Sequence, residues 1–369
     1  MSNQSKTIPS LHGLRAISIV LVIVSHCFLH TRGQSAAAKA LLALAGNGTV
    51  GVSIFFVVSG FLITLLLLRE RCNAGQIDLS DFYLRRVFRI LPAFVVYVAV
   101  VAVLTSAGVL SIPSQQFWHA LTFTMDYVTE KNWFLGHVWS LSVEEQFYVI
   151  WPFLVVLCSR RVLTIITGSV IVLGPFIRIL DRIVLPGTRF EIEYMGHTRA
   201  DMLMFGCLIA LYFDDDRLRA LLAKAIARGV PLMAALFLFI ISPVIEMRFG
   251  GVYIKTIGYS LQGLSISFIM LYLVTRPEGD FGRLFNSKLA IRVGAISYSL
   301  YLWQEMFIGF REFSVAGSLM RIAGAFVAAE ISYHFVETPL LRLKRRLSEE
   351  RPRGSMLDET IAGQIAVDS

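Results

Sequence analysis

The stretch at residues 13–30 reads GLRAISIVLVIVSHCFLH. It is apolar and long enough for a membrane-spanning helix, which needs about 20 mostly apolar residues. It also contains Arg15 and, eleven residues later, His26. A charged group inside a spanning helix costs about 2.5–3.5 kcal/mol on insertion scales, so such residues usually serve a function. We therefore expect this helix to contribute to a site within a membrane.

The remainder of the chain has the same apolar character. Of its 369 residues, 56% are hydrophobic and 16% are charged, whereas an average soluble domain has about 25% charged residues. Apolar windows recur up to residue 336, which predicts an all-α, polytopic transmembrane helical bundle. The ten predicted spans are 13–31, 50–68, 90–110, 139–158, 162–184, 200–213, 229–245, 256–274, 293–310 and 315–336. We place a membrane domain at 1–341 and a basic, then polar, disordered tail at 342–369.

The distribution of Lys and Arg predicts the orientation, because basic loops stay on the cytoplasmic side. With both termini in the cytoplasm, that side holds about twice as many basic residues as the other. Topology and contact with anionic lipid headgroups then explain the net charge of +8, and we expect no nucleic-acid partner. Neither the four cysteines nor the histidines show paired or metal-ligand spacing, so we expect no disulfide and no metal.

A carboxylate is predicted at the depth of His26. Glu144 lies about five residues from the outer end of the span 139–158, and His26 lies equally near the outer end of its own span. At about 1.5 Å per residue, both lie roughly 6–8 Å below the outer surface. An imidazole oriented by a carboxylate can act as a general base on a hydroxyl group. The alternative is a structural His–Glu hydrogen bond between two helices.

A group of arginines is predicted at the cytoplasmic end of the first span. Arg85 and Arg89 share a helix face through their i, i+4 spacing, and Arg86 lies beside them. Arg15 lies at the same end, about 16 Å from His26 along the helix axis. Arginine binds phosphate through paired hydrogen bonds, so the group is suited to a phosphorylated ligand. The alternative is a basic anchor that contacts anionic lipids.

Several motifs occur together in one order between about residues 11 and 341. They are Leu14-Arg15-Ala16 with His26, Phe55 to Phe61, Arg85-Arg86 with Arg89-Ile90-Leu91-Pro92, Trp139 to Tyr148, Arg199-Ala200-Asp201 to Gly206, Ser297 to Trp303, and Val336-Glu337-Thr338-Pro339. In this combination the chain resembles the acyltransferase-3 family of membrane acyltransferases. Each motif is short, but the ordered set is specific.

This resemblance implies a ten-helix enzyme that moves an acyl group, often acetyl, from a cytoplasmic donor such as acetyl-CoA. The implied acceptor is a hydroxyl group of an extracytoplasmic or lipid-linked glycan, and acyl-CoA is a co-substrate rather than a bound cofactor. The family's Arg–His pair corresponds to Arg15 and His26, with His26 catalytic. Other positions implied to function are Glu144, Ser59, Arg85, Arg86, Arg89, Arg199 and Asp201. Acceptor-side or supporting roles are assigned to Trp139, Ser140, Tyr298, Tyr301, Trp303 and Gln304.

Two departures from the family pattern affect this expectation. Relatives often have a histidine where this chain has Gln304, and an amide cannot act as a base, so His26 is the expected catalytic base. Many relatives also carry a soluble esterase-like domain, and we expect none here, because predicted spans occupy the chain to about residue 336.

The leading hypothesis is an O-acyltransferase for a surface polysaccharide, a lipopolysaccharide or a similar glycan in a bacterial inner membrane. His26 would be the base, Glu144 its orienting partner and the arginines the donor site. A small-molecule or lipo-oligosaccharide acceptor and an acyl-histidine intermediate remain open. A proton-coupled transporter would also keep His and Glu within the membrane, but the arginines would then be unexplained. A third hypothesis is a non-catalytic scaffold in a glycan-assembly complex.

Overall fold

Every regular element in the described residues is helical. The computed structural model describes residues 8–30, 48–185, 187, 191–309 and 315–349. In chain order the elements are α1 (Pro9–His30), α3 (Gly48–Ala74), α4 (Leu79–Ser106), α5 (Ser114–Leu121), η1 (Met125–Tyr127), α6 (Trp133–Gly136), α7 (Trp139–Leu157), α8 (Arg160–Val184), α9 (Gly196–Tyr212), α10 (Asp216–Ala227), α11 (Val230–Leu236), η3 (Phe237–Ile241), α12 (Ser242–Phe249), α13 (Gly251–Tyr253), η4 (Ile254–Gly258), α14 (Tyr259–Thr275), α15 (Asp280–Phe285), α16 (Lys288–Ala295), α17 (Ser297–Ile308), α18 (Val315–Ser332), η5 (Tyr333–Glu337) and α19 (Thr338–Glu349). The predicted all-α class is confirmed.

Within the described ranges, eight helices are long and apolar enough to cross a membrane. They are Pro9–Cys27, Gly48–Ala74, Leu79–Ser106, Trp133–Leu157, Arg160–Val184, Val230–Phe249, Gly251–Thr275 and Gly317–Lys344. Three of them contain a π-helical turn (η3, η4 and η5), so short elements join into one continuous span. These eight helices correspond to eight of the predicted spans.

The other two predicted spans form shorter helices. The span predicted at 200–213 is α9, which has 17 residues and is buried along almost its whole length. The span predicted at 293–310 is divided at Ile296 between α16 and α17, and α17 has 12 residues. A helix of 12 residues is about 18 Å long, well short of a bilayer core of about 30 Å. A count of ten spans therefore stays a prediction.

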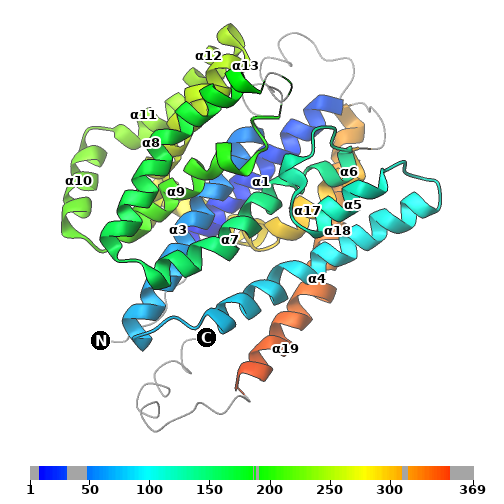
Figure 1. Ribbon diagram of the computed structural model, residues 1–369, viewed down its shortest axis with the longest axis horizontal. Coiled ribbons are helices and arrows are strands. Elements are labelled where there is room, and N and C mark those ends of the chain that lie inside the picture. Colours follow the sequence, from blue (N-terminus) through cyan, green and yellow to red (C-terminus); the bar gives the residue numbers. More distant parts are fainter. Residues whose placement is uncertain (1–7, 31–47, 186, 188–190, 310–314, 350–369) are drawn as a thin grey trace.

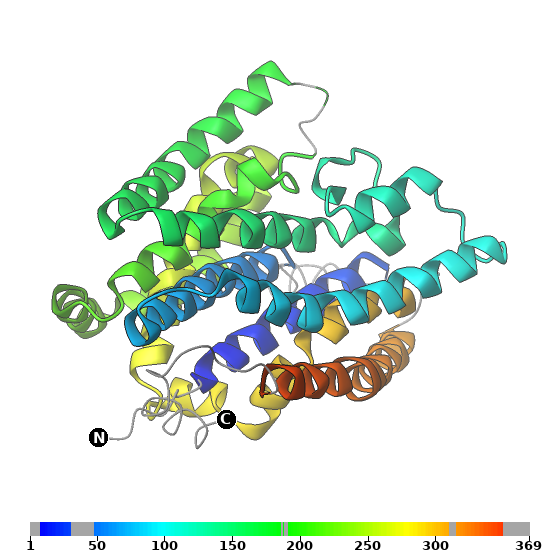
Figure 2. The ribbon, with the colours of Figure 1, turned by 60° about the horizontal axis from the view of Figure 1, so that its bottom comes forward.

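Helices α1, α3 and α9 lie at the centre of the bundle. Figures 1 and 2 show α8 and α11 on one side of this centre, and α4, α18 and α19 on the other. The approach of α3 to α9 requires two glycines: a Cβ on Gly60 would lie 2.0 Å from the carbonyl oxygen of Leu203, and one on Gly206 would lie 2.0 Å from that of Val57. Helices without side chains at their contact can approach this closely, which is a common packing mode in membranes.

The predicted disordered tail begins at residue 342, but α19 continues as a helix to Glu349. Lys344 of this helix lies 2.8 Å from Asp81 of α4. This ion pair connects α19 to α4. Disorder of the tail stays a prediction, and residues 350–369 lie outside the described ranges.

Candidate active site

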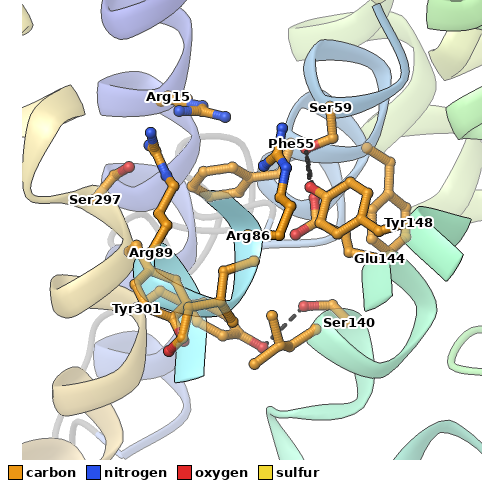
Figure 3. Close-up of a pocket in the computed structure, with 14 residues that line it drawn as sticks. Arg15, Phe55, Ser59, Arg86, Arg89, Ser140, Glu144, Tyr148, Ser297 and Tyr301 are labelled. Carbon is orange, nitrogen blue, oxygen red and sulfur yellow. Dashed lines mark hydrogen bonds between the residues drawn. The ribbon is translucent and has the colours of Figure 1, made fainter. Parts of the chain in front are cut away.

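A narrow cavity between α1, α3, α4, α7 and α17 is lined by three arginines (Figure 3). The guanidinium groups of Arg15, Arg86 and Arg89 gather at one end, whereas Ser140 and Tyr301 lie toward the other. The cavity has a volume of about 70 Å³. Three positive charges in one small space repel each other and favour an anion among them. We call this space the arginine cavity.

Arg85 does not line the arginine cavity, although the sequence grouped it with Arg86 and Arg89 as a ligand-binding cluster. Its guanidinium pairs with Asp81 and, at 3.0 Å, with Glu70 on the exposed side of α4. Arg86 turns inward instead, and its guanidinium carbon lies 4.7 Å from the centre of the Tyr148 ring. The inward arginines of α4 are therefore spaced i, i+3, which also places two residues on one helix face.

Glu144 faces the arginine cavity from α7. The hydroxyl of Ser59 donates a 2.6 Å hydrogen bond to Glu144 Oε1, and the Tyr148 hydroxyl donates to Ser59 Oγ at 3.3 Å. The carboxylate thus lines the same cavity as the three arginines. Two positions that the family resemblance implied, Ser59 and Glu144, are in direct contact.

A larger cavity of about 320 Å³ surrounds His26. Most of its wall comes from α1, α3, the segment around α6, α7 and α17. The lining residues are Val22, Ser25, His26, Gly48, Thr49, Val52, Lys131, Asn132, Trp133, Gly136, His137, Trp139, Ser140, Tyr194, Tyr301 and Glu305. We call this space the His26 cavity. It combines one accessible imidazole with several aromatic walls.

The ring of His26 is held from α17. Its Nδ1 atom lies 2.9 Å from Gln304 Oε1 and 3.5 Å from Glu305 Oε1. The amide oxygen of Gln304 is an acceptor, so Nδ1 donates in this contact, and in the neutral ring Nε2 then keeps its lone pair. The indole ring of Trp133 lies edge-on to the imidazole, with ring centres 5.2 Å apart. The glutamine at position 304, where relatives often have a histidine, is therefore in direct contact with the proposed catalytic residue His26.

Glu305 lies between two imidazole rings. Besides its contact with His26, its Oε2 atom lies 3.0 Å from Nδ1 of His137. Glu305 is only 3% exposed and His137 only 6%. We did not single out either residue from the sequence. A sequence signal existed, because Glu305 is an acidic residue within the apolar window 293–310, directly after Gln304.

The predicted pairing of His26 with Glu144 is wrong. Among the described residues, Glu144 bonds to Ser59 in the arginine cavity, whereas His26 contacts Gln304 and Glu305 in the His26 cavity. Equal depth in a membrane does not determine the direction in which each side chain leaves its helix. The carboxylate near His26 is that of Glu305.

Arg199 and Asp201 line neither cavity. Asp201 forms a fully buried ion pair with Arg178 of α8 at 3.0 Å and accepts a hydrogen bond from Ser260. Arg199 donates to Ser53 and lies 3.8 Å from the centre of the Tyr259 ring. Breaking a buried ion pair by removing one partner costs about 3–5 kcal/mol, so Asp201 serves to fix α8 to α9.

The aromatic positions of the motifs divide between the two cavities. Trp139 faces the His26 cavity, and Tyr298 lines the arginine cavity while donating a hydrogen bond to the carbonyl of Ile90. Tyr301 lines both cavities, as does Ser140. Trp303 packs edge-on against Tyr97 behind the cavities, with ring centres 5.5 Å apart. In the described part of the chain, no three His, Cys, Asp or Glu side chains are grouped to hold a metal ion.

Comparison with known proteins gives a consistent result. The chain is 29% identical to the O-acetyltransferase OatA of Staphylococcus aureus (strain NCTC 8325 / PS 47), over 90% of this chain and 57% of that protein. It is 27% identical to the peptidoglycan O-acetyltransferase OatA of Listeria monocytogenes serovar 1/2a (strain ATCC BAA-679 / EGD-e), over 91% of this chain and 56% of that protein. The chain thus spans a little over half the length of these curated relatives, and no solved structure matches it.

The profile of the acyltransferase-3 family, described as an acyltransferase domain, matches residues 8–329. This match includes both cavities and most of the apolar helices. The chain is accordingly a multi-pass membrane protein that belongs to the acyltransferase-3 family of integral membrane acyltransferases.

Proposed function

We propose that this protein is a membrane O-acyltransferase that moves an acyl group, acetyl in the first instance, from acyl-CoA to a hydroxyl group of a glycan. One observation carries the proposal: a histidine with a free Nε2 atom lies in one cavity, and three arginines line the adjoining one. A thioester donor with a phosphorylated end and a reactive end needs both features.

The donor would bind with its phosphates at Arg15, Arg86 and Arg89. Guanidinium groups bind phosphate oxygens through paired, charge-assisted hydrogen bonds. Arg15 and His26 belong to the same helix and are about 16 Å apart along its axis. The extended arm of CoA covers a comparable distance, so its thioester could reach His26 while its phosphates stay with the arginines.

His26 would act as general base through Nε2. It would take the proton from the acceptor hydroxyl while that oxygen attacks the thioester carbonyl. Collapse of the tetrahedral intermediate breaks the C–S bond, and the CoA sulfur leaves with the proton that His26 had taken. Gln304 would hold the required tautomer through Nδ1, and the Glu305 carboxylate would stabilise the imidazolium ion. Glu144 would act in the arginine cavity instead, as a partner of Ser59.

The acceptor would enter the His26 cavity. Trp133, Trp139 and Tyr194 give this cavity aromatic walls against which the apolar face of a sugar ring can pack. The Listeria relative is described as a peptidoglycan O-acetyltransferase, and a peptidoglycan glycan is our first choice of acceptor. A surface polysaccharide, a lipopolysaccharide or a small hydroxyl compound would require the same chemistry.

The proposed topology has ten spans and both termini in the cytoplasm of a bacterial cell, with the protein in the plasma membrane. The excess of basic residues on the side of the N-terminus supports this orientation. The arginine cavity would then receive a cytoplasmic donor, and His26 would lie near the outer surface.

The test uses the full chain in lipid nanodiscs with acetyl-CoA and a chito-oligosaccharide, and measures CoA release and base-labile acetate on the sugar. His26→Ala should abolish both signals. His119→Ala is the control, because His119 is exposed and bonds only Thr124 among the contacts described for it. Sugar acetylation by His26→Ala at the normal rate would refute the mechanism. Absence of acetyl-CoA turnover in the unaltered protein would refute the function and favour a transporter.

A further inference from the structure

The two cavities share a wall made of two side chains. Among the described residues, only Ser140 of α7 and Tyr301 of α17 line both the arginine cavity and the His26 cavity. Their hydroxyl groups lie 2.8 Å apart and are hydrogen-bonded (Figure 3). The Tyr301 hydroxyl also donates to the main-chain carbonyl of His137, so Ser140 is the donor in the first bond. Each residue is 8% exposed.

This wall lies on the path that the proposed donor must take. The arginine cavity has about 70 Å³, whereas pockets for small organic ligands have about 300–1,000 Å³. The arm of a donor held at the arginines therefore does not fit unless something moves. The His26 cavity, with about 320 Å³, adjoins it, and Ser140 and Tyr301 line both spaces.

The wall is held by side-chain hydrogen bonds. The phenol hydroxyl of Tyr301 donates to the carbonyl of His137 and accepts from Ser140. A change in the side-chain torsions of Tyr301 would break both bonds without moving a helix. The carbonyl of His137 and the hydroxyl of Ser140 remain available to receive the phenol again.

We infer that Ser140 and Tyr301 form a passage through which the acyl end of the donor reaches His26, and that the width of this passage limits the size of the acyl group. This inference rests on the proposed function, because it takes the arginines as the phosphate site and His26 as the base. The acyl group enters first and must pass the displaced Tyr301 ring before the thioester reaches His26. A short acyl group passes, and a longer or branched one is obstructed by the ring.

The first experiment measures donor selectivity. Rates with acetyl-CoA and butyryl-CoA are compared for the unaltered protein, Tyr301→Leu and Tyr298→Leu. Tyr298 is the matched control, since it lies on the same helix but lines only the arginine cavity. Tyr301→Leu should raise the butyryl-to-acetyl rate ratio by about tenfold, the scale on which a pocket discriminates extra methylenes. Tyr298→Leu should leave the ratio unchanged.

The second experiment blocks the passage reversibly, so that folding is not in question. Ser140→Cys is made in a background with Cys72→Ser and Cys158→Ser, which removes the two cysteines that are not buried. Benzyl methanethiosulfonate then attaches a bulky group to Cys at this position, and dithiothreitol removes it. The attached group should lower acetyl transfer by about 100-fold, a loss typical of reactants kept out of position. Affinity for CoA itself, measured by calorimetry, should be unchanged, and reduction should restore transfer.

The outcomes separate this inference from the proposed function. If the unaltered protein neither binds CoA nor releases it from acetyl-CoA, the proposed function is wrong. If it does both, the passage is refuted by an unchanged chain-length ratio in Tyr301→Leu, or by full transfer in the benzylated protein. A benzylated protein that also loses CoA affinity refutes the passage as well, because the block would then lie within the arginine site.

Discussion

Replacing Glu305 by glutamine tests the carboxylate that the structure places beside the catalytic candidate. Glutamine keeps the size of the side chain and one acceptor oxygen but removes the negative charge. Glu305 Oε1 lies 3.5 Å from His26 Nδ1, and its side chain is 4% exposed. At this separation, two unit charges interact by about 5 kcal/mol at an effective dielectric constant of about 20. This energy would stabilise the imidazolium ion and so the transition state.

The expected loss of rate is smaller than that figure implies, because the same carboxylate faces His137 at 3.0 Å. We expect Glu305→Gln to lower kcat by about 10²–10³-fold, which corresponds to about 3–4 kcal/mol. The affinity for CoA should not change, because Glu305 does not line the arginine cavity. The assay is single-turnover acetyl transfer in nanodiscs, with CoA binding measured separately.

A matched control exists elsewhere in the chain. Glu330 lies 3.5 Å from the His334 imidazole and also pairs with Arg292, outside both cavities, so Glu330→Gln removes a carboxylate beside a histidine that is not part of the site. It should leave kcat unchanged. A kcat for Glu305→Gln equal to that of Glu330→Gln would refute the role of Glu305. A loss in CoA affinity without a loss in kcat would refute it too.

Three further predictions concern the donor site, the packing and the topology. Arg89→Ala should weaken CoA binding by about 10- to 100-fold, which is the contribution of a hydrogen bond to a charged group. Binding of pantetheine, which has no phosphate, should be unchanged. Arg85→Ala is the control, and equal losses of CoA binding in both variants would indicate lipid anchoring. Arg178→Met should lower the free energy of unfolding by about 3–5 kcal/mol, because it leaves a buried carboxylate without its partner; an unchanged thermal midpoint would contradict this. A cysteine at Ser80 should react only from the cytoplasm and one at Ser114 only from outside, and labelling of both from the same face would refute the proposed topology.

Apolar composition was sufficient to predict the helical class and eight of the spans. It also assigned spans to two segments that form helices of 17 and 12 residues, which are below the length of the eight apolar helices. The interior helix α9 is surrounded by protein, so burial of its side chains does not require a length that matches the bilayer. In α17, a run of Ser and Tyr residues supplies cavity walls and not lipid-facing surface. Hydropathy alone does not distinguish burial in protein from burial in lipid.

The sequence pointed to several residues that line the two cavities, but it missed Glu305 and gave His26 the wrong carboxylate partner. Depth places His26 and Glu144 at one level, but the direction of each side chain depends on how its helix is rotated against its neighbours. The same limit applies to α4. Either Arg86, at i, i+3 spacing, or Arg85, at i, i+4 spacing, can share a helix face with Arg89. The rotation of α4 is decided by contacts distant in sequence, among them the pairing of Arg85 with Glu70. A single sequence contains no direct record of such contacts.

The wall between the two cavities has an electrical consequence for the cell. In the proposed topology, one cavity faces the cytoplasm and the other faces outward, so joining them would create a water-filled route across the membrane. A proton moving through such a route would gain about 2.3 kcal/mol for each 100 mV of membrane potential. The hydroxyl pair of Ser140 and Tyr301 then also blocks proton leakage between the cavities. When the donor displaces Tyr301, the acyl arm of the donor occupies the opening. Leakage would be expected only in proteins whose wall stays open while no donor is present.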